Sequence, residues 1–97
     1  MIGSGFNYRY WDSGFLRLFD EASSRGFEWN KDIVQSLFDA EECALALDEL
    51  AAAYLNNAKQ FPSDILNLFD DLATRIGIVD GDEYDSVAEL RALPRQP

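Results

Sequence analysis

The sequence predicts an all-α fold, a compact antiparallel bundle of four to five short helices. Apolar residues recur at helical spacing in four segments and less regularly in a fifth, and residues typical of helix ends separate these segments. No segment alternates apolar and polar residues over four pairs, as a half-buried strand would. The chain has 97 residues, 47% of them hydrophobic and 13% aromatic. We therefore expect one domain over residues 1–97 with a single core.

The first two expected helices follow an aromatic N-terminal arm, residues 1–11. Asp12 or Ser13 can cap a helix that begins near Gly14, and Gly26 is a suitable stop. A second helix is expected after Asn30, and it fades at residues 39–40. Two aromatic residues ahead of it, Phe27 and Trp29, are interpreted as anchors of the connection. The apolar stripes consist of Phe15, Leu16, Leu18, Phe19 and Ala22 in the first helix, and of Ile33, Val34, Leu37 and Phe38 in the second.

The third expected helix, EECALALDELAAAYLNN at residues 41–57, has the most regular pattern. Its stripe spans about 100°, the width of a core-facing helix surface. Cys43 lies on this stripe and is the only cysteine, so no disulfide can form within the chain. Because the chain has no histidine to activate a thiol, Cys43 is interpreted as a buried structural residue. The stripe consists of Cys43, Ala46, Leu47, Leu50 and Tyr54.

A fourth and a fifth helix complete the bundle. Ser63 can cap the fourth helix, with Pro62 in its first turn as an alternative, and Gly77 ends it. Asp82 can cap a fifth helix that Pro94 ends, leaving residues 94–97 as a loose tail.

The charge of the chain restricts its partners. Eighteen acidic residues face eight basic ones, and the net charge of −10 changes little between pH 6 and 8 because histidine is absent. Nucleic acid and anionic membrane surfaces are therefore poor partners. The acidity serves solubility alone, or it serves binding to a cationic protein.

Catalytic chemistry is not indicated. Without histidine the chain has no Ser-His-Asp or Cys-His unit and no histidine-containing zinc site, and it has no Walker-type or GxGxxG phosphate loop. The acidic stretch at residues 80–85 differs from a calcium loop, because its glycine is second and Tyr84 takes the fifth position. We expect no enzyme, no cofactor and no metal.

The expected location is the cytoplasm. The N-terminus does not have the basic and apolar regions of a secretory signal, and no apolar run approaches the roughly 18 residues of a spanning helix. One unpaired cysteine is typical of a reducing compartment. A monomer is the expected oligomeric state.

Residues 34–78 resemble the small helical immunity proteins of bacterial polymorphic-toxin and contact-dependent growth inhibition systems, close to the MafI type. The resemblance rests on an acidic start to an Ala-Leu helix, a proline-containing loop at residues 59–63, and a second amphipathic helix that ends in a hydrophobic–Gly–hydrophobic tripeptide. The residues that carry it are Glu41, Glu42, Ala46, Leu47, Leu50, Leu55, Pro62, Ile65, Leu66, Phe69, Leu72, Arg75, Ile76, Gly77 and Ile78.

The resemblance implies a cytoplasmic protein that binds and neutralises one cognate toxin domain, often a nuclease with a basic cleft. It implies no catalytic residue. Opposite charges on the two proteins can raise association rates to about 10⁸–10⁹ M⁻¹s⁻¹ at low salt. The alternative interpretation is an acidic nucleic-acid mimic or a regulatory adaptor that binds a basic housekeeping protein.

Two acidic runs without intervening bases are the candidate partner-binding surfaces. The first lies between Lys31 and Lys59, where the acids of the third helix are expected to share one face, and the second lies between Arg75 and Arg91. Tyr84 in the second run is either an aromatic anchor for the partner or a core residue. The candidate residues are Asp39, Glu41, Glu42, Asp48 and Glu49 in the first run, and Asp80, Asp82, Glu83, Tyr84 and Asp85 in the second.

Overall fold

The computed structural model describes residues 12–58, 60–78 and 83–94, and over these residues all regular secondary structure is α-helical. The all-α prediction is confirmed. The predicted arm at residues 1–11 and residues 95–97 of the predicted tail lie outside the described residues. The helices are α1 (Asp12–Ser24), α2 (Lys31–Asp39), α3 (Cys43–Asn57), α4 (Ser63–Ile76) and α5 (Asp85–Ala92).

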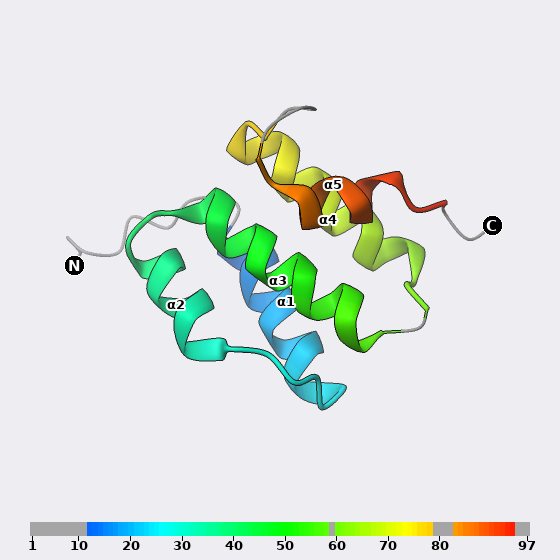
Figure 1. Cartoon of the computed structure of the whole chain (residues 1–97), viewed down its shortest axis with the longest axis horizontal. Coiled ribbons are helices and arrows are strands. Elements are labelled where there is room, and N and C mark those ends of the chain that lie inside the picture. The colour runs from blue at the N-terminus through cyan, green and yellow to red at the C-terminus, as the bar shows by residue number, and fades with distance from the viewer. Residues whose placement is uncertain (1–11, 59, 79–82, 95–97) are drawn as a thin grey trace.

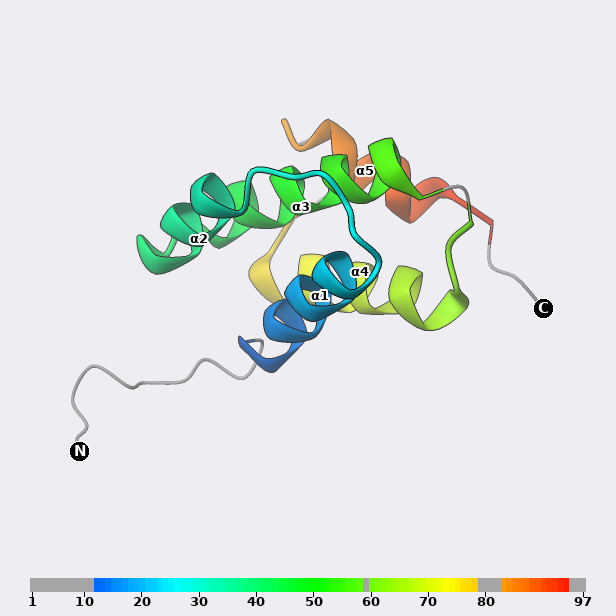
Figure 2. The same cartoon turned by 90° about the horizontal axis from the view of Figure 1, so that it is seen from below.

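The helices form two layers (Figures 1 and 2). One layer, here called the α3 layer, contains α2, α3 and α5, with α3 between the other two. The second, the α1–α4 layer, packs beneath it. Consecutive helices reverse direction at each connection, which is the predicted antiparallel arrangement. Helix α3 packs against each of the other four helices, so it organises the core.

The core-facing stripe of α3 confirms the sequence prediction. All five predicted stripe residues are buried, and Ala51 and Ala53 extend the stripe on either side. The alanines allow neighbouring helices to approach α3 closely, because they have no side chain beyond Cβ. Cys43 is buried, as expected.

Helix α1 lies very close to α4 at Gly14. A Cβ atom added there would lie 2.9 Å from Cδ2 of Leu72 and 3.2 Å from Cδ1 of Leu68. A larger residue at this position would have to shift these leucine methyl groups.

Aromatic rings fill the space between α1 and α2. The ring centroids of Phe15 and Phe38 are 4.8 Å apart, and Phe19 stacks on Trp29 at 5.7 Å. Trp29 is half-buried against the core, as expected of an anchor of the connection. Such ring pairs add about 0.5–1.5 kcal/mol each beyond the burial of their area.

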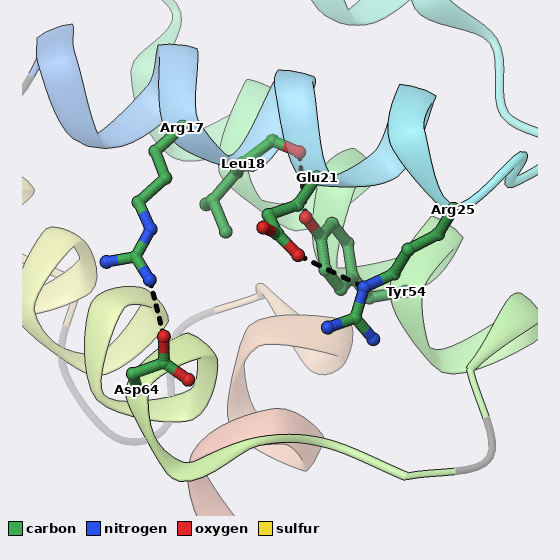
Figure 3. A network of polar contacts seen from close by, with 6 residues as sticks. All are labelled: Arg17, Leu18, Glu21, Arg25, Tyr54 and Asp64. Atoms are coloured by element: carbon green, nitrogen blue, oxygen red, sulfur yellow. Dashed lines mark hydrogen bonds and ion pairs between the residues drawn. The ribbon is translucent and has the colours of Figure 1, made fainter.

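Tyr54 joins the two layers at the centre of the molecule (Figure 3). Its ring is 1% exposed, and its hydroxyl donates a hydrogen bond to the backbone oxygen of Leu18 at 2.7 Å. Burial raises the pKa of the Tyr54 phenol well above its ordinary value, and the negative charge of Glu21 raises it further. The phenol therefore stays neutral and acts as a donor across the physiological range.

Two predicted glycine stops are confirmed. Gly26 and Gly77 have φ angles of 70° and 98°, in the left-handed region that side chains rarely adopt. After α4, the amide of Ile78 donates to the oxygen of Ala73 at 2.9 Å, the long hydrogen bond of a Schellman motif. The helix therefore ends with its last carbonyls satisfied.

Several helix starts differ from the predictions. Helix α1 begins at Asp12 rather than near Gly14. Pro62, not Ser63, occupies the N-cap position of α4, and its backbone oxygen accepts from Ile65 at 3.0 Å. The N-cap of α5 is Tyr84, whereas the predicted cap, Asp82, lies outside the described residues. No helix in the described part of the chain is both long and apolar enough to span a bilayer.

Candidate functional site

The first predicted acidic run lies on the hairpin formed by α2 and α3. Asp39 is the last residue of α2, Glu41 lies in the turn, and Glu42 is the N-cap of α3. The prediction that Glu41, Glu42, Asp48 and Glu49 share one helix face is wrong, because Glu41 lies in the turn before α3 and the carboxylate of Asp48 bonds to α5. Four of these five acids are exposed and Asp48 is half-buried. The hairpin therefore presents its acids at the turn and on α3 separately.

Glu41 explains why the helix does not start earlier. It has a φ of 63°, the only positive φ among the described residues other than glycine. Its conformation ends α2 with the same Schellman motif, in which the amide of Glu42 donates to the oxygen of Leu37 at 2.8 Å. Glycine holds the same position after α1 and α4. A residue with a Cβ is strained there by roughly 1 kcal/mol, so the turn retains an acid at a cost in stability.

The solvent-facing stripe of α3 carries a leucine between two glutamates. Leu45 is 44% exposed, three residues after Glu42 and four before Glu49. Residues three and four apart lie on the same side of a helix. Glu42 and Glu49 are thus separated by about 10 Å along the axis, at 1.5 Å per residue. Sequence reasoning missed Leu45, although a large apolar residue on the polar side of a regular helix was a visible signal.

Asp48 has a structural partner within the fold. Its carboxylate accepts a hydrogen bond from the backbone amide of Val87 at 3.0 Å. Val87 is the third residue of α5, and α5 has no side-chain cap of its own. Asp48 therefore caps α5 from across the layer. It points toward α5 rather than to solvent because adjacent helix positions are rotated by about 100°, which separates it from Glu49.

The second predicted run is only partly described. Glu83 and Asp85 are exposed at the start of α5, and Asp80 and Asp82 lie outside the described residues. Tyr84 is half-buried and packs against the core. That position agrees with the core interpretation of Tyr84.

The structure brings the two runs into one layer. Helices α2 and α5 flank α3, so the acids of the hairpin and those at the start of α5 belong to the same three-helix layer (Figure 1). The sequence separates these runs by the whole of α4, and their neighbourhood was not predicted. The candidate surface is therefore one three-helix layer rather than two isolated segments.

The described arginines all pair with acids of the α1–α4 layer. Arg91 is on α5, but its Nε lies 2.8 Å from Oδ1 of Asp70 on α4, and its guanidinium also donates to the oxygen of Ile78. The arginines of the α1–α4 layer all form ion pairs with acids of that layer (Figure 3 shows two of these pairs). These pairs are Arg17 with Asp64, Arg25 with Glu21, and Arg75 with Asp71.

The α2–α3 hairpin consequently carries uncompensated negative charge. Lys31 is the only basic residue within α2 and α3. No ion pair between described residues involves Asp32, Asp39, Glu42 or Glu49, and all four are exposed. This charge is available to a cationic partner.

Neither a metal site nor a similar known protein helps to define this surface. Within residues 12–58, 60–78 and 83–94, no group of three or more histidine, cysteine, aspartate or glutamate residues is placed to hold a metal ion. Comparisons of the chain with protein-family models, curated proteins and solved structures gave no significant match.

Proposed function

We propose that the protein is an immunity protein that binds and neutralises a cognate bacterial toxin domain, with a nuclease as the toxin class. The acidic α3 layer is the binding surface, and the target is a basic surface of the toxin. The protein acts as a stoichiometric inhibitor in the cytoplasm, without catalysis of its own.

The observation that carries this proposal is the uncompensated charge of the α2–α3 hairpin. Asp32, Asp39, Glu42 and Glu49 of this hairpin form no ion pair with any described residue, whereas each described arginine pairs with an acid. A single-sign field of this kind accelerates the encounter with an oppositely charged protein. Fast capture suits an inhibitor that must reach a toxin before the toxin acts.

The resemblance of residues 34–78 to MafI-type immunity proteins supports the same function. Those residues form most of α2, all of α3 and α4, and the connections between them, so the resemblance covers the acidic hairpin and the helix beneath it. A rigid helical scaffold also suits an inhibitor whose acids must match fixed positions on a toxin.

Co-expression with the C-terminal domain encoded by an adjacent gene tests the proposal. We expect rescue of growth and co-purification of the two proteins as a complex. Affinity should fall steeply between 0.05 and 1 M salt, because the Debye length shrinks to about 3 Å at 1 M. Capture of a housekeeping DNA- or RNA-binding protein without rescue would instead favour the adaptor function.

A charge reversal at the hairpin turn tests the surface. Changing Glu41 and Glu42 together to lysine should weaken toxin binding measured by calorimetric titration, while helicity and melting stay nearly unchanged. Replacement of Asp20 on α1 by lysine is the single-charge control, since it changes an exposed acid outside the α3 layer. Unchanged affinity of the double variant at low salt would exclude the hairpin turn as the contact.

A further inference from the structure

We infer that the partner docks on the solvent-facing stripe of α3, seating Leu45 in a shallow apolar recess that is flanked by lysine or arginine side chains. This inference rests on the proposed function and names the chemistry of the surface that the partner must present. The flanking cations bind Glu42 and Glu49.

Among the described residues, no helix packs over this stripe of α3. Helices α2 and α5 cover its two flanks, and α1 and α4 pack against it from the second layer. Most residues toward those neighbours are buried, whereas Leu45 and Glu49 are exposed. A partner that lies across the α3 layer meets this stripe at its centre.

Charge complementarity determines the kind of partner. Glu42 and Glu49 form no ion pair with any described residue, and their spacing of about 10 Å places one carboxylate on each side of Leu45. Nucleic acid is repelled by this arrangement, and a purely apolar partner would leave both carboxylates desolvated and unpaired. A basic protein surface with an apolar recess satisfies all three side chains.

Helix α1 provides a matched control for this stripe. Leu16 and Asp20 repeat the exposed leucine and the acid four residues later, and Leu16 is 50% exposed. They belong to the α1–α4 layer. The two pairs share residue chemistry, spacing and exposure and differ in their layer.

The experiment titrates four variants against the toxin domain encoded by the adjacent gene, using calorimetry at 0.05 and 1 M salt. The variants are Leu45→Ser, Glu49→Lys, Leu16→Ser and Asp20→Lys. We expect Leu45→Ser and Glu49→Lys to weaken binding more than about tenfold and the α1 variants less than about twofold. The effect of Glu49→Lys should shrink at high salt, while that of Leu45→Ser persists because apolar contact is not screened.

The outcomes distinguish the failure of the docking stripe from the failure of the proposed function. We expect circular dichroism melts to show that all four variants fold, since every changed side chain is exposed. A complex that forms with equal affinity for all four variants would overturn the α3 docking stripe and leave the proposed function standing. Failure of the wild-type protein to bind the toxin domain would overturn both.

Discussion

The two layers differ in how their charged residues are paired. In the α1–α4 layer, Arg17, Arg25 and Arg75 each form an ion pair with an acid of the same layer. Arg91 of α5 also pairs with an acid of this layer, Asp70 of α4. In the α3 layer, Asp32, Asp39, Glu42 and Glu49 have no such partners among the described residues. Exposed ion pairs contribute only about 0–1 kcal/mol each. The difference therefore concerns the electric field of the molecule far more than its stability.

The largest expected effect tests whether the layers form one cooperative unit. Phe15→Ala removes a fully buried ring that contacts Phe38 on α2, and it should lower the free energy of unfolding by about 3–5 kcal/mol. Urea unfolding followed by circular dichroism and by tryptophan fluorescence should give coincident transitions at a lower midpoint. Separate transitions would show that the layers unfold independently.

The link between the layers at Tyr54 predicts a loss of stability in alkali. The pKa of the Tyr54 phenol is raised in the folded state, so its contribution is complete below the ordinary phenol pKa of about 10 and is lost as pH rises above it. The wild-type protein should lose about 1.4 kcal/mol per pH unit above pH 10 relative to Tyr54→Phe. The free energy of unfolding of both proteins is measured by chemical denaturation at each pH. Parallel pH profiles would contradict the raised pKa of the Tyr54 phenol.

Two adjacent acids of α3 should separate stability from binding. Asp48→Ala removes the cap of α5 and should cost about 1 kcal/mol of unfolding free energy while hardly changing toxin affinity. Glu49→Ala should weaken toxin binding and change the free energy of unfolding by less than about 0.5 kcal/mol. Denaturant titration and calorimetric binding of both variants measure this. Equal effects of the two changes would remove the distinction between a structural and a binding acid.

Glu41→Gly should stabilise the protein by roughly 0.5–1 kcal/mol, because glycine adopts the positive φ of this turn without strain. The measurement is the shift of the urea midpoint, with Gly77→Ala as the opposite control, which should destabilise. A loss of stability on Glu41→Gly would show that the glutamate side chain contributes more than the strain costs.

The smallest expected effect concerns the ion pairs themselves. Arg75→Ala breaks the pair with Asp71 on the surface of α4 and should change the free energy of unfolding by less than about 0.5 kcal/mol. Thermal melts at low and high salt measure the change. A loss of several kcal/mol would mean that the pairs of the α1–α4 layer determine its stability, contrary to the comparison above.

The helical architecture could be predicted because it depends on local patterns. The stripe of α3 and the stops at Gly26 and Gly77 follow from helical periodicity and from the left-handed freedom of glycine. The start of α3 could not be predicted, because nothing in the sequence indicates that Glu41 takes a conformation usually reserved for glycine. Local patterns predict the helices that form, but not a strained residue between them.

The candidate site was less predictable because it depends on contacts between distant residues. The role of Asp48 rests on a backbone amide 39 residues away, and the pairing of Arg91 with Asp70 rests on how α5 crosses α4. Charge counting along the chain identified the acidic runs but not which acids face solvent. It also did not indicate that the runs share a layer.

The cap that Asp48 supplies to α5 has a consequence for the order of folding during synthesis. An eight-residue helix without its own cap is too short to persist alone in water. During translation α3 leaves the ribosome before α5, so the carboxylate of Asp48 has already emerged when α5 follows. Helix α5 should therefore form after α3, by joining a helix that already exists rather than by nucleating the fold.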